Sequence, residues 1–243
     1  MTSLLRKFTT SFVAGLTVAA LLLVLGNSGT LPWFPPPVVF PLVALTVLGS
    51  LIFPFIWHYR ERKKPGDSDR IYAVLFTVIR YSIAFNIASF GWKKIFGLQF
   101  IVPSEIAGQP MNQQPGETLT WYYFGYSPVF GTLIAITQLV GSYLLLFRKT
   151  FLMSCLVLFT LMLNIALVNI FYDMNAGAST QGIILTLGLL FLLLTEYQKL
   201  VAVFIQSDSA LPRLTFSNGL VKNMVRVSAI VLSLLFVYFV VKS

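Results

Sequence analysis

Two cations inside one apolar stretch carry the clearest chemistry in this sequence. Residues 80–100, RYSIAFNIASFGWKKIFGLQF, are apolar enough to cross a bilayer, yet they include Arg80 and Lys94. On a helix, which turns by about 100° per residue, these two side chains share one face with Ala84 and Gly91. A charge at the bilayer centre costs on the order of 3 kcal/mol even on the most lenient scale. We therefore expect this face to look inward, where the cations could bind an anionic or quinone-carbonyl group.

Arg80 also has a structural interpretation. It could pair with a carboxylate or with the carbonyl groups at a helix end and hold helices together. Glu196 is the expected partner, because both residues are predicted in the cytoplasmic half of the bundle. The sequence leaves both interpretations open.

A second group of polar and aromatic residues is predicted near the external end of the bundle. Lys93 and Lys94 could snorkel to the headgroups or line a pocket. Asn169 and Asp173 are four residues apart and share a helix face, although Asp173 could equally be a turn residue. The expected ligand-binding residues are Arg80, Gly91, Trp92, Lys94, Trp121, Tyr122, Asn169, Tyr172 and Asp173.

The composition is that of an integral membrane protein. Of the 243 residues, 57% are hydrophobic and 10% are charged, and the mean hydropathy is +0.83; a soluble domain has about 25% charged residues. The net charge of +9 lies in short clusters between apolar runs, which is typical of membrane loops and does not indicate a nucleic-acid partner. A single cysteine, Cys155, and a single histidine, His58, exclude an internal disulfide, a bis-histidine haem and a multi-histidine metal site.

Seven apolar runs predict an all-α polytopic membrane helix bundle with a central four-helix core. The expected helices cover residues 12–25, 38–57, 71–96, 127–147, 151–172, 181–194 and 225–241. Aromatic residues at 121–126 predict a short interfacial helix. The sixth helix is expected to continue past Glu196 to about Ile205, and Gln138 and Asn164 to form hydrogen bonds between helices.

The chain is expected to divide into three parts. Residues 1–70 form an N-terminal hairpin and a basic loop, residues 71–206 form the core, and residues 207–243 form a loop and the last helix. We interpret the first apolar run as an uncleaved helix and not as a signal peptide. Thirteen loop lysines and arginines fall on the side of the N-terminus and three on the other, which predicts a cytoplasmic N-terminus and an external C-terminus.

Four short motifs follow the arginine in order. They are FGWKKIFGLQF at 90–100, WYYFGYSPVFG at 121–131, LLLFRKT at 144–150 and NIFYDMNAGA at 169–178. In order and spacing, residues 71–206 resemble the DoxX family of small bacterial membrane proteins, of the type found in Bacteroidetes. Gln138 stands where relatives often have a carboxylate. The resemblance implies the bacterial inner membrane, a periplasmic C-terminus and, for some members, thiosulfate or quinone oxidation or thiol-redox complexes.

Three functions remain open. The first is a redox-associated membrane protein that binds a quinone or another lipid-soluble ligand between the third and sixth helices. Its electrons would come from the ligand or from a partner, since the chain has no redox cysteine pair and no dinucleotide fingerprint. The second is a non-catalytic subunit or assembly factor with a membrane or periplasmic protein partner. The third is a small-solute or lipid transporter, for which an inverted repeat or broken helices would be expected.

Overall fold

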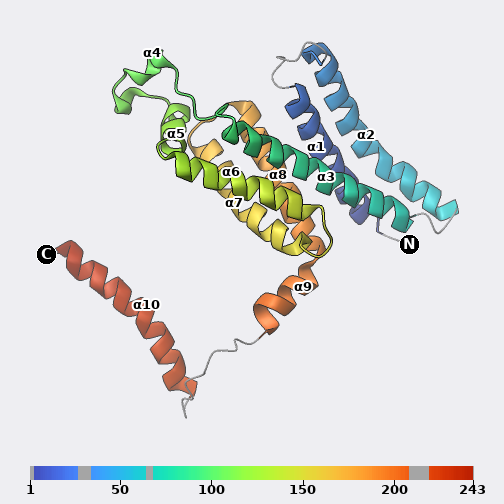
Figure 1. Cartoon of the computed structure of the whole chain (residues 1–243). Helices are drawn as coiled ribbons and strands as arrows, with labels where there is room; N and C mark the ends of the chain where they lie inside the picture. Colours follow the sequence, from blue (N-terminus) through green and yellow to red (C-terminus); the bar gives the residue numbers. More distant parts are fainter. Residues whose placement is uncertain (1–2, 27–33, 64–67, 208–218, 243) are drawn as a thin grey trace. The chain divides into compact units, whose positions relative to one another are not determined.

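The computed structural model describes residues 3–26, 34–63, 68–207 and 219–242, and the regular structure in them is helical throughout (Figure 1). Seven of these helices are long and apolar enough to cross a membrane. They are α1 (Leu4–Gly26), α2 (Pro36–Lys63), α3 (Ser68–Ile95), α6 (Pro128–Leu145), α7 (Phe151–Phe171), α8 (Ala176–Thr195) and α10 (Gly219–Lys242). The prediction of an all-α polytopic bundle is confirmed, and the chain is a multi-pass protein of a lipid bilayer.

The short elements lie between the long helices and after α8. They are α4 (Ser104–Ala107), the 3₁₀ turn η2 (Met111–Gln113), α5 (Gly116–Gly125), α9 (Tyr197–Val201) and the π-helical turn η3 (Ala202–Gln206). The aromatic cluster at 121–126 lies on α5 and the residue that follows it, as the sequence predicted. The predicted extension of the sixth helix is present, but it is interrupted at Glu196, which ends α8.

Two predicted turns are helical. The predicted basic loop at 59–70 is largely taken up by the end of α2 and the start of α3, with residues 64–67 outside the described residues. The predicted turn at 175–180 is the start of α8. The side-chain oxygen of Asn175 accepts a hydrogen bond from the backbone N–H of Ala178 at 3.0 Å and caps this helix.

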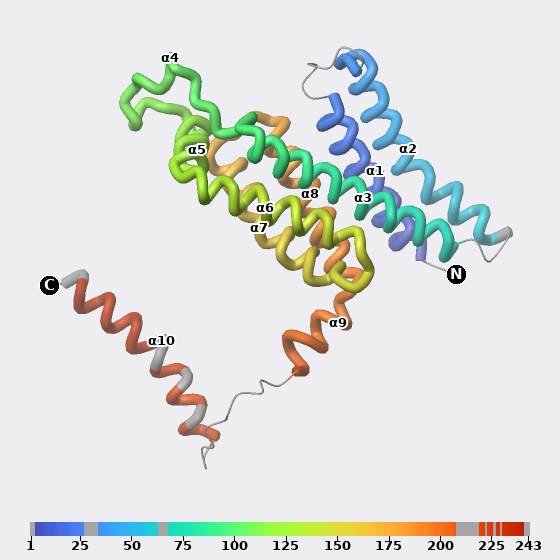
Figure 2. The backbone as a smooth tube through the Cα atoms, in the orientation of Figure 1, coloured from blue at the N-terminus to red at the C-terminus, as the bar shows by residue number. Residues whose placement is uncertain are grey.

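Residues Met1–Leu200 form one compact unit and Val201–Ser243 a second. The predicted boundary after residue 206 falls near this division, whereas the one after residue 70 separates no units. The reason is that α1 packs against α3 and α8 as well as α2 (Figure 2). Gln181 of α8 donates a hydrogen bond to the backbone oxygen of Ala20 of α1 at 3.0 Å. Interhelical hydrogen bonds of this kind stabilise helix contacts in a bilayer.

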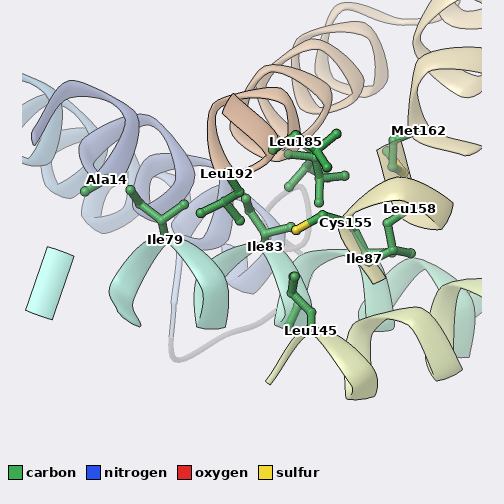
Figure 3. Packing of buried hydrophobic residues seen from close by; sticks show 13 residues of the cluster. Ala14, Ile79, Ile83, Ile87, Leu145, Cys155, Leu158, Met162, Leu185 and Leu192 are labelled. Carbon is green, nitrogen blue, oxygen red and sulfur yellow. The ribbon is translucent and has the colours of Figure 1, made fainter. Parts of the chain in front are cut away.

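An aliphatic core fills the centre of the first unit, between α3, α7 and α8 (Figure 3). Its fully buried side chains include Ile79, Ile83, Ile87, Leu158, Leu185, Leu189 and Leu192. Cys155 lies in this core as a buried, free cysteine. In this core Cys155 packs as a small apolar side chain.

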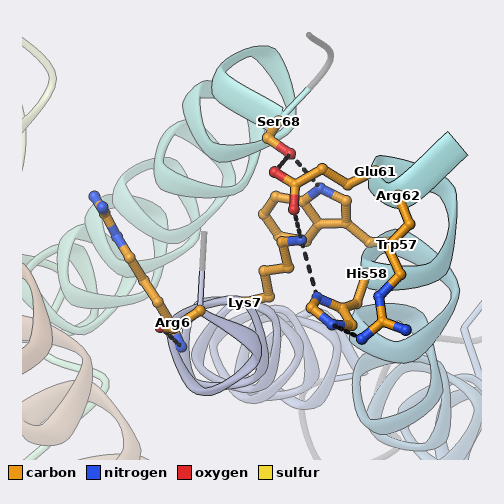
Figure 4. A network of polar contacts seen from close by, with 8 residues as sticks. Arg6, Lys7, Trp57, His58, Glu61, Arg62 and Ser68 are labelled. Carbon is orange, nitrogen blue, oxygen red and sulfur yellow. Dashed lines mark hydrogen bonds and ion pairs between the residues drawn. The ribbon is translucent and has the colours of Figure 1, made fainter. Parts of the chain in front are cut away.

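A buried ion pair joins the first turn of α1 to the last turn of α2 (Figure 4). Lys7 has no exposed side-chain surface and pairs with Glu61. Glu61 also accepts a hydrogen bond from Ser68 at the start of α3, and Ser68 accepts one from the Trp57 ring N–H at 3.1 Å. The Nζ atom of Lys7 lies 3.4 Å from Nδ1 of His58. This network therefore places the single histidine of the chain against Lys7.

Candidate functional site

A cavity of about 650 Å³ lies at the end of α1 away from Lys7. Seven of the described helices contribute to it: the last turns of α1 and α3, the second half of α7, the first turns of α2, the first half of α8, the short helix α5, and the middle of α6. Its volume falls in the range of about 300–1,000 Å³ that is typical of sites for small molecules. Because the helices alternate in direction, residues far apart in sequence meet here.

Three of the predicted ligand-binding residues line this cavity, namely Lys94, Trp121 and Asn169. The Nζ atom of Lys94 donates a hydrogen bond to the backbone oxygen of Phe90 at 3.4 Å, and it lies 5.7 Å from the centre of the Phe100 ring. Asn169 donates a hydrogen bond to the backbone oxygen of Ala178 at 2.9 Å. The cavity therefore has lysine ammonium groups, since Lys93 also lines it, and one fixed amide where the sequence predicted polar groups.

Phe100 is a cavity residue that the sequence analysis missed. Its backbone has φ of +66°, a left-handed conformation that costs a non-glycine residue about 1–3 kcal/mol. This conformation holds the ring 5.6 Å from the rings of both Trp121 and Phe124, centre to centre. The three rings and Lys94 form one side of the cavity. A backbone conformation of this kind has no signal in the sequence, since phenylalanine rarely adopts it.

Two buried glutamines also line the cavity. Gln138 is 1% exposed, and its side-chain oxygen accepts no hydrogen bond from the described residues. The side-chain oxygen of Gln181 also accepts none from them. An unsatisfied buried polar group costs about 1–3 kcal/mol, and such groups often mark a bound water, ion or ligand. The expectation that Gln138 bonds between helices is wrong, and Asn164 is exposed. A glutamine within an apolar helix was the signal for this position, but the wrong role was assigned to it.

The carboxylate of Glu117 fastens α5 to the start of α8 beside the cavity. It accepts hydrogen bonds from the ring N–H of Trp121 at 3.4 Å and from the side-chain amide of Asn175 at 3.2 Å. Trp121 and Asn175 both line the cavity, whereas Glu117 is not among its described lining residues. Glu117 therefore acts on the site by positioning the helix that carries its aromatic residues.

The remaining predicted residues lie outside the cavity lining; they are Arg80, Gly91, Trp92, Tyr122, Tyr172 and Asp173. Trp92 is 51% exposed and stacks on Phe96. Asp173 is exposed, with φ of +49°, and follows the end of α7, which fits its interpretation as a turn residue. Gly91 is a packing position, because a Cβ atom there would lie 2.9 Å from the Leu139 side chain.

Arg80 lies in the other half of α3 and contacts the end of α6. Its Nε and Nη2 atoms donate hydrogen bonds to the backbone oxygen of Leu145 at 3.1 and 2.8 Å. The expected ion pair between Arg80 and Glu196 does not form among the described residues, since Glu196 pairs with Lys199 at 2.5 Å. The Leu145 carbonyl is free to accept these hydrogen bonds because the last carbonyls of a helix have no partner within the helix.

The arrangement at the cavity is suited to binding. It combines an ammonium group, side-chain amides and aromatic rings around an apolar volume. In the part of the chain that the structure describes, no group of three or more histidine, cysteine, aspartate or glutamate residues is placed to hold a metal ion. The chemistry that these residues supply is therefore charge, hydrogen bonds and stacking.

Comparison with known proteins gives a relative of unassigned activity. No family model matches the sequence, and no solved structure matches it. The uncharacterized protein YwoB of Bacillus subtilis (strain 168) is 30% identical over 128 residues, which are 52% of this chain and 80% of the relative. The match covers most of the relative, so the chain belongs to the same family as YwoB.

Proposed function

We propose that this chain is a membrane-embedded binding protein that takes a quinone or another lipid-soluble molecule into the cavity beside Lys94. The observation that carries the proposal is the cavity itself, with its volume of about 650 Å³. Apolar and aromatic side chains line it together with a few polar groups, a combination that is typical of small-molecule sites. A ligand from the bilayer would fill this volume.

The polar groups of the cavity suit a ligand with oxygen acceptors. The ammonium group of Lys94 and the side-chain amide of Gln138 can donate hydrogen bonds to the carbonyl oxygens of a quinone. The rings of Phe100, Trp121 and Phe124 offer a surface on which a flat ring can stack. These groups bind and orient the ligand, and any electrons would come from the ligand or from a partner protein.

The resemblance of residues 71–206 to the DoxX family supports a redox-associated role for the ligand. The same resemblance and the charge of the loops support the bacterial inner membrane, with the N-terminus in the cytoplasm and the C-terminus in the periplasm. In this orientation the cavity lies at the periplasmic end of the bundle. A partner at that surface would be a membrane or periplasmic protein.

The direct test is to fill the cavity. Ala178 lines it, whereas Ala176 lies two residues away, is exposed and does not line it. The wild-type protein and the variants Ala178→Trp and Ala176→Trp would be reconstituted in phosphatidylcholine nanodiscs with decylubiquinone or dodecanol. Native mass spectrometry should find a bound ligand in the wild type and in Ala176→Trp, and none in Ala178→Trp. Equal binding by all three proteins, or by none, would contradict the proposal.

A further inference from the structure

The charges around the cavity indicate the head group of its ligand. Lys93 and Lys94 both line it, and its described lining residues include no aspartate or glutamate. We infer that the cavity prefers a single-chain amphiphile with an anionic head group, a carboxylate or a phosphate monoester, bound beside Lys94. This inference rests on the proposed function, and it specifies the chemical class of the ligand.

Lys94 is the group that would hold the anion. Its contacts are the Phe90 carbonyl at 3.4 Å, which is a long hydrogen bond, and the face of the Phe100 ring at 5.7 Å. Among the described residues it has no carboxylate partner within ion-pair distance. An ammonium group within a membrane-spanning helix is expensive, and such groups normally pair with another charge or with carbonyls. A bound anion would provide the missing charge.

Glu117 is a carboxylate beside the cavity, and its described hydrogen bonds go to residues other than Lys94. It accepts from Trp121 and from Asn175, as described above. It lies outside the described lining and forms no ion pair with Lys94 among the described residues. The charge of the lining itself is positive.

The rest of the cavity suits an alkyl chain. Aliphatic side chains from five of the described helices line it, among them Leu23, Val39, Ile134, Met162 and Leu185. The side-chain N–H groups of Gln138, which also lines the cavity, can donate a hydrogen bond to a second head-group oxygen. A neutral carbonyl can accept the same hydrogen bonds, but it leaves the ammonium charge uncompensated.

The test compares head groups on one chain length and removes one lysine at a time. Dodecanoate, dodecyl phosphate, dodecanol and decylubiquinone would be titrated against the wild-type protein in phosphatidylcholine nanodiscs. The variants are Lys94→Gln, Lys94→Arg and, as a matched control, Lys149→Gln; Lys149 is exposed in the turn between α6 and α7. Native mass spectrometry would give the bound fraction, and circular dichroism would confirm that each variant is folded.

We expect at least one of the two anions to bind more tightly than dodecanol and decylubiquinone. Lys94→Gln should weaken binding of that anion by about tenfold or more, while Lys94→Arg and Lys149→Gln retain it. Dodecanol binding should not change in Lys94→Gln. If a neutral ligand binds the wild type as tightly as both anions do, or Lys94→Gln binds them normally, the inference is overturned and the proposed function stands. If none of the four ligands binds, both fail.

Discussion

The guanidinium group of Arg80 donates two hydrogen bonds to the backbone oxygen of Leu145, from Nε at 3.1 Å and from Nη2 at 2.8 Å. Leu145 is the last residue of α6, and the guanidinium also lies 5.1 Å from the centre of the Phe151 ring at the start of α7. One side chain of α3 thus contacts both helices where the chain turns from α6 to α7. This arginine stabilises the bundle at a distance from the cavity.

Replacing Arg80 should therefore lower stability and spare the ligand. Arg80→Leu leaves the carbonyl of Leu145 without its two donors, which should cost about 1–3 kcal/mol. Arg80→Lys should lose less, because an ammonium group can still donate. Thermal unfolding in detergent would measure the change in melting temperature. If Arg80→Leu keeps the wild-type melting temperature but loses ligand binding, Arg80 acts in ligand binding and not in stability.

The crossing of α3 and α6 should depend on the absence of a side chain at Gly91. A Cβ atom there would lie 2.9 Å from Cγ of Leu139 and 3.1 Å from the backbone oxygen of Ala135, whereas one at Gly49 would meet nothing within 4 Å. We expect Gly91→Ala to destabilise the protein by about 1–3 kcal/mol. Gly49→Ala, the control, should be neutral or slightly stabilising, since alanine favours helix. Equal melting temperatures for the two variants would contradict the close packing at Gly91.

The buried pair of Lys7 and Glu61 should behave as one unit. Lys7→Met alone removes the lysine that pairs with the buried carboxylate of Glu61 and should cost about 3–5 kcal/mol. The double variant Lys7→Met with Glu61→Gln removes both charges and should recover most of the loss. Unfolding midpoints of the single and double variants would measure the coupling between the two sites. Additive losses would show that the two charges act independently.

Loop residues test the orientation that the charge bias predicts. Gln109 and Lys149 are both exposed. Gln109 lies in the segment between α3 and α6, and Lys149 lies in the turn between α6 and α7, so the membrane-spanning helix α6 separates them along the chain. In a Cys155→Ala background, a membrane-impermeant maleimide added to intact cells should label Gln109→Cys and leave Lys149→Cys unlabelled until the cells are broken. The reverse pattern would place the cavity end in the cytoplasm.

Hydropathy is sufficient to place the seven long helices of the described residues. In the bilayer core the backbone N–H and C=O groups of each apolar run must form hydrogen bonds with one another, which a helix allows. The partners of the charged residues could not be found in this way. A backbone carbonyl such as that of Leu145 has no sequence signal, so Arg80 was assigned to Glu196, the carboxylate expected in the same half of the bundle. The helical turn at 175–180 was missed for a similar reason, since its capping by Asn175 depends on one local hydrogen bond.

The site could be predicted only in part. Lys94, Trp121 and Asn169 were identified because each is a polar or aromatic residue that was predicted near the external end of the bundle. The contribution of α1 and α2 was missed, since the resemblance to the DoxX family covers only residues 71–206. Phe100 and Gln181 were missed because their roles depend on a left-handed backbone and on a contact with Ala20 of α1. These are properties of the packed bundle.

The central claim is that the cavity beside Lys94 holds a lipid-soluble ligand, and locating a heavy atom tests it most directly. Crystals of the protein would be grown separately with a bromine-labelled alkylquinone and a bromine-labelled fatty acid, and the anomalous scattering of bromine would be mapped. We predict a bromine peak among the residues that line the cavity, between Lys94, Trp121 and Met162, for at least one of the two ligands. Bromine peaks confined to the lipid-facing surface with both ligands would contradict the claim.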